Sequence, residues 1–396
     1  MITVLEGGLT TVPGFLAAGV RAGIKRRGLD LMLLVGEDGP MSAAGSFTTN
    51  LVKGAPLYVT IEHLRDGKLA AVVANSGCAN AYTGRQGIRD ARRMARLTAR
   101  LLKLRSDDVA VASTGLIGSR LPMRRIEAGI RAAASELSNS REASLNAAKA
   151  IMTTDTFPKE VAVRVDLEDG TTVTIAGIAK GAGMIRPRMK VATMFALVVT
   201  DAAASPAALR DALDNSLQRS FNMITVDGDT STNDTVLLMA NGRAKNRPIT
   251  LRHPDRMFQA GLNYVLTELA RMIVRDGEGS SHLIEVRVKN ARNEQDARQA
   301  ALAVAGSNLV KAAVFGRDPN WGRVIAALGY SGASFDPSKI SLEFASDRGR
   351  VDLIERGKPK SKRALDRARD LMRSQEIEIH IDLAAGKFSA TAWGCD

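Results

Sequence analysis

The order of apolar and polar positions along the chain predicts strands that alternate with helices. Short apolar runs at 31–35, 70–74 and 109–112 have the length and composition of buried strands. The segment 85–104 has apolar residues at helical spacing with arginines between them, which predicts an amphipathic helix with an Arg-rich solvent face. We therefore predict an α/β protein of layered sheets and helices.

Turn and cap signals mark the boundaries of several elements. Glycines around the run at 31–35 predict a hairpin at a sheet edge. Two alternating strands between residues 160 and 180, joined by Glu168-Asp169-Gly170, predict a second hairpin. Ser205 and Pro206 have the residue types of an N-cap and a first helical turn, so a helix is expected from there to about residue 222.

Two of the predicted strands end in polar, glycine-containing stretches. The strand at 70–74 leads into NSGCANAYTG, and the strand at 109–112 leads into STGLIG. Loops at strand ends are where α/β sheets usually hold ligands. We expect a tight turn at Thr114-Gly115, which serves either as a plain chain reversal or as an oxyanion hole, in which a hydroxyl and an unobstructed glycine amide face a developing negative charge.

Composition narrows the class of protein. The 396 residues, 45% of them hydrophobic, are enough for two domains or one large two-part unit. No apolar run approaches the roughly 18 residues of a membrane span, and the N-terminus lacks the apolar core of a secretory signal. We therefore expect a cytoplasmic protein without a membrane partner, in which Cys78 and Cys395 are free thiols.

The formal net charge of +13 suggests an anionic partner. The cations are spread over polar helical faces and aromatic residues make up only 4% of the chain, which leaves few platforms for stacking bases. We interpret the charge as a solvated basic surface that also suits acidic substrates, and not as a nucleic-acid site. Asp227-x-Asp229 lacks the other ligands of a calcium loop, and no cofactor or zinc motif occurs, so neither a metal nor a cofactor is predicted.

The stretch 180–194, KGAGMIRPRMKVATM, has a second candidate chemistry. Pro187 interrupts regular structure, and Ala192-Thr193 then runs into the apolar block MFALVV. Thr193 is either an ordinary strand residue or the nucleophile of a self-cleaving precursor. In the second case its hydroxyl attacks the preceding carbonyl, and hydrolysis leaves an N-terminal threonine whose own α-amine is the general base.

Seven separated motifs, taken in order, favour the second interpretation. Together they resemble the ornithine acetyltransferase family, the bifunctional glutamate N-acetyltransferases of arginine biosynthesis, over nearly the whole chain. The motifs are NSGCANAYTG (75–84), STGLIG (113–118), MTTDTFPK (152–159), KGAGMIRPRMKVATM (180–194), DGDTSTNDT (227–235), DGEGS (276–280) and FGRDPNWGR (315–323).

The resemblance implies self-cleavage between Ala192 and Thr193. The products are an N-terminal chain, 1–192, and a C-terminal chain, 193–396, that begins with the nucleophile. The two chains are expected to stay together, and the family suggests a heterotetramer with two copies of each. Thr193 is also expected to contact the substrate.

The resemblance also implies the remaining site residues. Thr114 and Gly115 match the oxyanion-hole pair of the family. Thr153 and Lys180 match substrate-binding positions, where the cation of Lys180 can hold an α-carboxylate. Glu278 matches a substrate ligand suited to the cationic amino group of ornithine.

The expected reaction is acetyl transfer from N2-acetylornithine to glutamate through an acetyl-threonine intermediate. No cofactor is implied, although acetyl coenzyme A is a possible second acetyl donor. Two alternatives stay open at this point. One is an N-terminal-nucleophile aminopeptidase or amidase on the same scaffold, and the other is a non-enzymatic basic binding protein, which only the net charge supports.

The sequence departs from the family pattern in three places. Two extra residues separate Pro187 from Ala192, which bears on the efficiency of cleavage. Ser281-His282 stands where family members often have Thr-Lys. Family chains also continue past the Trp-Gly-Cys-Asp region with a tail that contacts substrate, whereas the sequence here ends at Asp396.

Overall fold

The computed structural model describes residues 1–186 and 194–396, and they form two compact units. The first unit contains residues 1–181, 194–222 and 230–273. The second contains residues 182–186, 223–229 and 274–396. Each unit draws on residues from both sides of position 192, so the compact units differ from the predicted cleavage products. The cleavage itself stays a prediction, because Ala192 and Thr193 lie outside the described residues.

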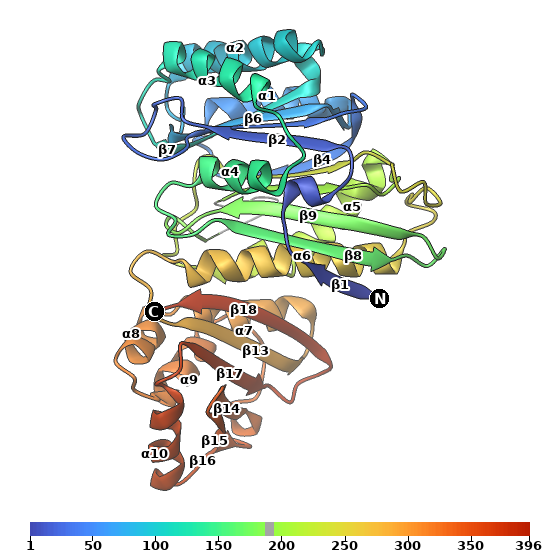
Figure 1. Cartoon of the computed structure of the whole chain (residues 1–396). Coiled ribbons are helices and arrows are strands. Elements are labelled where there is room, and N and C mark those ends of the chain that lie inside the picture. The colour runs from blue at the N-terminus through green and yellow to red at the C-terminus, as the bar shows by residue number, and fades with distance from the viewer. Residues whose placement is uncertain (187–193) are drawn as a thin grey trace. The chain divides into compact units, whose positions relative to one another are not determined.

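The first unit is layered, as predicted for an α/β protein (Figure 1). A seven-stranded sheet has the strand order β1-β8-β9-β10-β12-β4-β5, and a four-stranded sheet has the order β2-β3-β6-β7. The seven-stranded sheet comprises β1 (Ile2–Leu5), β4 (Met41–Phe47), β5 (Lys68–Leu69), β8 (Lys159–Asp166), β9 (Thr172–Lys180), β10 (Phe195–Thr200) and β12 (Thr235–Ala240). The four-stranded sheet comprises β2 (Phe15–Val20), β3 (Leu31–Gly36), β6 (Ala71–Cys78) and β7 (Val109–Leu116).

Helices cover both sheets of the first unit. Four helices pack on the four-stranded sheet, while α5 packs on β4 and α6 on β8 and β9 of the other sheet. Close packing of α6 depends on small residues, since a Cβ on Gly177 of β9 would lie 3.0 Å from Leu269. The helices are α1 (Ala55–His63), α2 (Gly84–Leu102), α3 (Met123–Ser135), α4 (Arg141–Ile151), α5 (Pro206–Leu217) and α6 (Arg256–Arg275).

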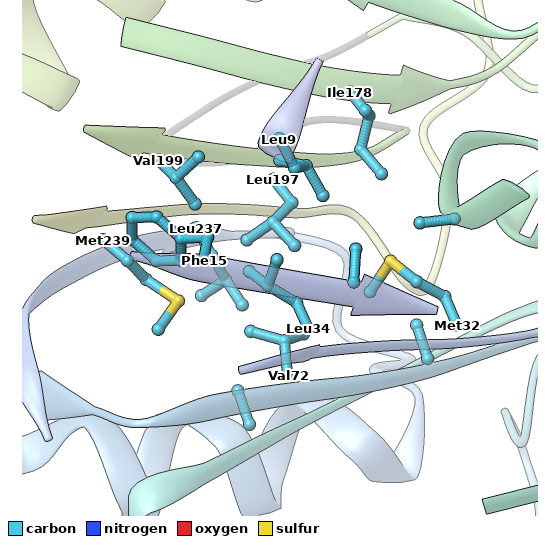
Figure 2. Close-up of a cluster of buried hydrophobic side chains, with 14 of the residues drawn as sticks. Leu9, Phe15, Met32, Leu34, Val72, Ile178, Leu197, Val199, Leu237 and Met239 are labelled. Atoms are coloured by element: carbon cyan, nitrogen blue, oxygen red, sulfur yellow. The ribbon is translucent and has the colours of Figure 1, made fainter. Parts of the chain in front are cut away.

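The main core lies between the two sheets. Figure 2 shows side chains of the four-stranded sheet meeting those of the seven-stranded sheet. Full burial of each such aliphatic or aromatic side chain stabilises the fold by about 1.5–3 kcal/mol. The labelled residues are Leu9, Phe15, Met32, Leu34, Val72, Ile178, Leu197, Val199, Leu237 and Met239.

Both predicted hairpins are confirmed. β2 pairs antiparallel with β3 at the edge of the four-stranded sheet. β8 pairs antiparallel with β9 through the turn at Gly170, whose N–H donates to the Leu167 carbonyl at 3.1 Å. The predicted cap of α5 is also present, because the Ser205 side chain accepts a hydrogen bond from the Ala208 N–H at 3.3 Å.

The second unit is one sheet with helices against it. The strand order is β11-β18-β13-β17-β14-β15-β16, and α7 packs on β13 and β18 while α10 packs on β14 and β15. The strands are β11 (Ile224–Thr225), β13 (Leu283–Ala291), β14 (Ser341–Ser346), β15 (Gly349–Glu355), β16 (Lys358–Pro359), β17 (Glu376–Asp382) and β18 (Phe388–Cys395). The helices are α7 (Glu294–Ala305), α8 (Asn308–Phe315), α9 (Trp321–Gly329) and α10 (Lys362–Leu371).

Two further expectations are addressed by the fold. Cys78 and Cys395 are both free and buried, as predicted for thiols. Within residues 1–186 and 194–396, none of the helices combines the length and the apolar character needed to span a bilayer.

Candidate functional site

Thr114 and Gly115 lie within a strand, so the predicted tight turn is wrong. β6 and β7 continue as a parallel pair beyond their apolar runs, with Ser76 opposite Thr114 and Gly77 opposite Gly115. Gly115 has φ +128°, and a Cβ there would lie 2.4 Å from the carbonyl carbon of Gly77. Any other residue would therefore be strained and would push the strands apart. Thr114 is half-buried and Gly115 is exposed, so both are accessible from solvent.

Side-chain amides hold the ends of these two strands together. The Ser113 hydroxyl donates to Asn75 Oδ1 at 2.7 Å, and Asn75 Nδ2 donates to the Cys78 carbonyl at 2.9 Å. Asn233, just before β12, uses both protons of its amide, one on the Ala79 carbonyl at 2.6 Å and one on the Ser113 carbonyl at 2.8 Å. The peptide that precedes Thr114 is therefore fixed from a segment more than a hundred residues away in sequence.

Thr153 lies in a loop that is organised by Asp155. Asp155 Oδ2 accepts from the Thr153 N–H at 2.9 Å, and Oδ1 accepts from the Gly181 N–H at 2.6 Å and from Lys159 Nζ at 2.8 Å. The side chains of Asp155 and Lys159 are both fully buried. This single carboxylate therefore connects the predicted substrate residue Thr153 with the backbone that follows Lys180.

Electrostatics keep Asp155 ionised. Burial alone would raise the pKa of this carboxyl, but the charges of Lys180 and Lys159, with the hydrogen bonds from Lys159 and the Thr153 N–H, lower its pKa to about 2. Lys180 is the last residue of β9, is 8% exposed and is paired in register with Phe195 of β10. The structure thus brings Thr153 and Lys180 to one place in the first unit, around Asp155.

Glu278 belongs to the second unit, in the loop between α6 and β13. Its backbone N–H donates to the Ala182 carbonyl at 2.9 Å, and its side chain is exposed. A Cβ on Gly183 would lie 2.5 Å from the carboxyl carbon of Glu278, so the glycine leaves room for this side chain. Asp227, the first residue of the motif DGDTSTNDT, accepts from the Met184 N–H at 2.5 Å and from the Ile185 N–H at 2.9 Å.

The departure at Ser281-His282 forms a local network with Asp396. Asp396 Oδ2 lies 2.5 Å from His282 Nδ1 and accepts from the Ser281 hydroxyl at 2.5 Å, while Oδ1 accepts from both backbone N–H groups. Burial would raise the pKa of Asp396, but the hydrogen bonds from Ser281 and His282 lower it to about 2. These three side chains therefore satisfy one another inside the second unit.

Sequence reasoning missed two residues of this site. Asp155 was visible only as one polar residue of the motif MTTDTFPK, and Asn233 only as one residue of the motif DGDTSTNDT. The sequence signal available for Asp155 was a lysine four residues later, whereas nothing local distinguishes Asn233 from the hydroxyl residues beside it. The predicted nucleophile Thr193 and its neighbour Ala192 lie outside the described residues.

A groove of about 650 Å³ lies on the sheet of the second unit, between β13, β14, β15, β17 and β18. Charged residues line it, among them Arg287, Glu343 and His380. Of the predicted site residues that the structure describes, none lines this groove.

A layered α/β fold in which a threonine loop, a glycine amide and two lysines surround one buried, ionised carboxylate is typical of an enzyme. The chain belongs to the ArgJ family, whose model matches residues 16–396. It is 54% identical to the arginine biosynthesis bifunctional protein ArgJ of Symbiobacterium thermophilum, over 99% of this chain and 96% of the relative. It is 48% identical to the glutamate N-acetyltransferase of Methanothermobacter thermautotrophicus, over 99% of this chain and 94% of the relative.

Among solved structures, the chain is similar to the ornithine acetyltransferase of Mycobacterium tuberculosis complexed with ornithine. The identity is 44% and the TM-score is 0.45, with 48% of this chain and 99% of that chain covered.

Proposed function

We propose that the protein is a glutamate N-acetyltransferase of arginine biosynthesis, which moves an acetyl group from N2-acetylornithine to glutamate. The observation that carries this proposal is the 54% and 48% identity, over nearly the whole chain, to relatives named as the bifunctional enzyme and as glutamate N-acetyltransferase. The site agrees with it, since an amino-acid substrate needs cations for its carboxylate and an accessible oxyanion hole for its acyl group.

The chemistry proceeds in two half-reactions on Thr193. Its α-amine accepts the hydroxyl proton, Oγ attacks the acetyl carbonyl of N2-acetylornithine, and the C–N bond breaks with ornithine leaving as the protonated amine. The amine of glutamate then attacks the acetyl-threonine ester and releases N-acetylglutamate. The tetrahedral intermediate of each half-reaction carries its negative oxygen toward Thr114 and Gly115.

The other residues bind and orient the amino acids. Lys180 faces the α-carboxylate, and Thr153 supplies a hydroxyl from the loop that Asp155 fixes. Glu278 pairs with the side-chain ammonium of ornithine. Gly115 suits the oxyanion hole because a larger residue cannot occupy its backbone conformation or the space beside Gly77.

The proposal includes the maturation of the protein. The chain is made as a precursor, is cleaved between Ala192 and Thr193, and assembles in the cytoplasm as a heterotetramer of two N-terminal and two C-terminal chains. No cofactor takes part, and acetyl coenzyme A is a second acetyl donor for glutamate in the bifunctional form of the activity.

Mass spectrometry and a denaturing gel test this proposal together. Purified protein is expected to run as two bands of similar size, and N-terminal sequencing of the longer species is expected to begin at Thr193. Incubation with N2-acetylornithine alone should add one acetyl group to the chain that starts at Thr193, and glutamate should remove it. Thr193→Ala should stay uncleaved and inactive, whereas the exposed Thr154→Ala serves as the control.

Two results would contradict the proposal. An uncleaved protein with full acetyl-transfer activity would leave the mechanism without its base. Release of free acetate at the same rate with and without glutamate would indicate an amidase instead of a transferase. Activity with acetyl coenzyme A in place of N2-acetylornithine separates the bifunctional from the monofunctional form.

A further inference from the structure

Lys25 lies in a loop that a buried carboxylate shapes. Asp30 is fully buried at the start of β3, and its side chain accepts hydrogen bonds from the backbone N–H groups of Ala22, Ile24 and Lys25 at 2.6, 2.6 and 2.9 Å. The Asp30 carbonyl in turn accepts from the Ser76 N–H at 2.9 Å, on β6. The loop is therefore attached beside the end of β6, and the direction in which Lys25 leaves it is fixed.

The aliphatic part of Lys25 packs against Gly77. A Cβ on Gly77 would lie 2.8 Å from Lys25 Cγ, and Gly77 also has φ +97°. Gly77 is paired in register with Gly115, one of the predicted oxyanion residues. The Lys25 side chain therefore passes directly beside the paired strand ends that contain Gly77 and Gly115.

The ammonium of Lys25 reaches the other predicted substrate residues. Lys25 Nζ donates to the Met152 carbonyl at 2.8 Å, one residue before Thr153. The charges of Asp155 and Lys180 both act on it. Lys25 is thus connected to each group of predicted site residues in the first unit: the oxyanion pair, the Thr153 loop and Lys180.

The charges around Lys25 favour an anion. Asp155 already forms a buried ion pair with Lys159, so that pair is close to neutral. Lys25 and Lys180 then add two positive charges against the one negative charge of Asp30, which leaves one positive charge in excess, and the only hydrogen-bond acceptor of the Lys25 ammonium within the described residues is a carbonyl. Because an ammonium has three donors, two are left for a ligand. Burial lowers the pKa of Lys25 and the charge of Lys180 lowers it further, whereas Asp30 and Asp155 raise it, so a bound anion would relieve the repulsion between the two lysines.

We propose that Lys25 is a further substrate-binding residue, whose ammonium holds the α-carboxylate of the amino-acid substrate together with Lys180. The inference rests on the proposed acetyl transfer. In that reaction the acetylated nitrogen and the α-carboxylate share one carbon atom, so the carboxylate must lie close to the oxyanion hole. Lys25, packed on Gly77 beside Gly115, is the cation at that place.

The test compares Lys25→Gln and Lys25→Met with the exposed Arg27→Gln in the same loop, which removes the same charge from a solvated position. Lys25→Gln keeps an N–H donor for the Met152 carbonyl and loses the charge, whereas Lys25→Met loses both. Steady-state kinetics are measured with glutamate and with its α-amide as acceptors, and with N2-acetylornithine as donor. Denaturing gels and thermal unfolding show whether each variant is cleaved and folded.

Loss of one charge-assisted hydrogen bond should raise KM for glutamate and for N2-acetylornithine about tenfold or more in both Lys25 variants. The α-amide of glutamate should lose much less, because it has no carboxylate to bind, and Arg27→Gln should behave like the wild type. A Lys25→Gln enzyme with unchanged KM values overturns the inference, as does an equal loss for glutamate and its α-amide. If Lys25→Met does not fold, Lys25→Gln alone decides. Failure of the proposed function is seen separately, as absence of acetyl transfer by the wild type.

Discussion

The predicted site in the first unit and the sheet of the second unit use polar side chains in opposite ways. In the first unit, Asn233 and Asp155 bond to backbone groups of distant segments and fix the ends of strands. On the sheet of the second unit, charged side chains bond to one another across neighbouring strands. His380 of β17 lies 2.8 Å from Glu343 of β14, and Arg287 of β13 lies 3.3 Å from Glu378 of β17.

The difference explains why the larger concentration of charge is not the predicted site. Oppositely charged side chains that pair across a sheet neutralise each other, so little net charge remains there to attract a ligand. Side chains that bond to the backbone of strand ends fix that backbone. Groups attached to it or beside it, such as Thr114, Lys180 and Lys25, are then held in fixed positions. Long-range bonds from side chain to backbone are therefore a better sign of a site here than the number of ionisable residues.

The largest effect in a test of this comparison is expected for the variant Asp155→Ala. It leaves the fully buried Lys159 without its counter-charge, so the free energy of unfolding should fall by about 3–5 kcal/mol. Activity should be lost because the Thr153 loop and the peptide at Gly181 lose their common acceptor. Urea unfolding measures the first effect and acetyl transfer the second. Glu343→Ala, on the sheet of the second unit, is the control and should change both very little.

Lowering the pH should also reveal the contribution of Asp155 to the free energy of unfolding. The pKa of Asp155 is lowered in the folded state from 3.8 to about 2, so the unfolded chain takes up its proton first as the pH falls. The stabilisation from Asp155 is complete above about pH 4 and is lost between about pH 4 and pH 2, and it amounts to roughly 2 kcal/mol. Asp155→Asn should remove this part of the acid sensitivity. An unchanged slope of unfolding free energy against pH in the variant would count against the assignment.

Asn233→Ala should have an intermediate effect. It leaves the Ala79 and Ser113 carbonyls without their donor, which costs about 1–3 kcal/mol. Since the peptide before Thr114 is then free to shift, we expect kcat to fall about tenfold or more. Asn241→Ala is the matched control, because Asn241 also donates to a backbone carbonyl, that of Pro13, at 2.8 Å. Equal kcat in the two variants would show that Asn233 does not position the oxyanion strand.

The smallest effect is expected on the sheet of the second unit. His380→Gln should change the unfolding free energy by less than about 1 kcal/mol, because His380 and its two glutamate partners are partly exposed. The kinetic constants for both amino acids should stay at wild-type values. A clear loss of activity would assign this charged face a part in the reaction and remove the contrast between the units.

The elements that the sequence predicts well are those with a strong local pattern. The hairpin of β8 and β9 has alternating residues and a glycine turn, and α5 has a serine cap followed by proline. The ends of β6 and β7 were placed too early, because asparagine, serine and glycine are poor strand residues. They stay in the strands because tertiary hydrogen bonds, such as Ser113 to Asn75, satisfy their side chains in the interior.

Residues of the candidate site could be predicted only where they match a functional position in a motif that resembles the family. Thr114, Gly115, Thr153, Lys180 and Glu278 were named in that way. Asp155, Asn233 and Lys25 were not. Asp155 and Asn233 belong to motifs, but the contacts that give these three residues a part in the site include Gly181, Ser113 and Met152, which lie far away in sequence. No periodicity or spacing records such a contact, so these residues become visible only when the strands are assembled.

The pairing of β9 with β10 has a consequence for how the protein refolds before and after cleavage. Six residue pairs, from Lys180 and Phe195 to Ile175 and Thr200, join the segments on either side of residues 187–193, and the core between the sheets contains side chains from both. A backbone cut after residue 192 would therefore leave the native structure intact, because the strand pairing and the shared core hold the two pieces together. Once unfolded, however, the two pieces could diffuse apart, and recovery would become a second-order process that fails on dilution. The uncut polypeptide would refold at any dilution, so its maturation would turn a reversible folding reaction into one that runs well only once.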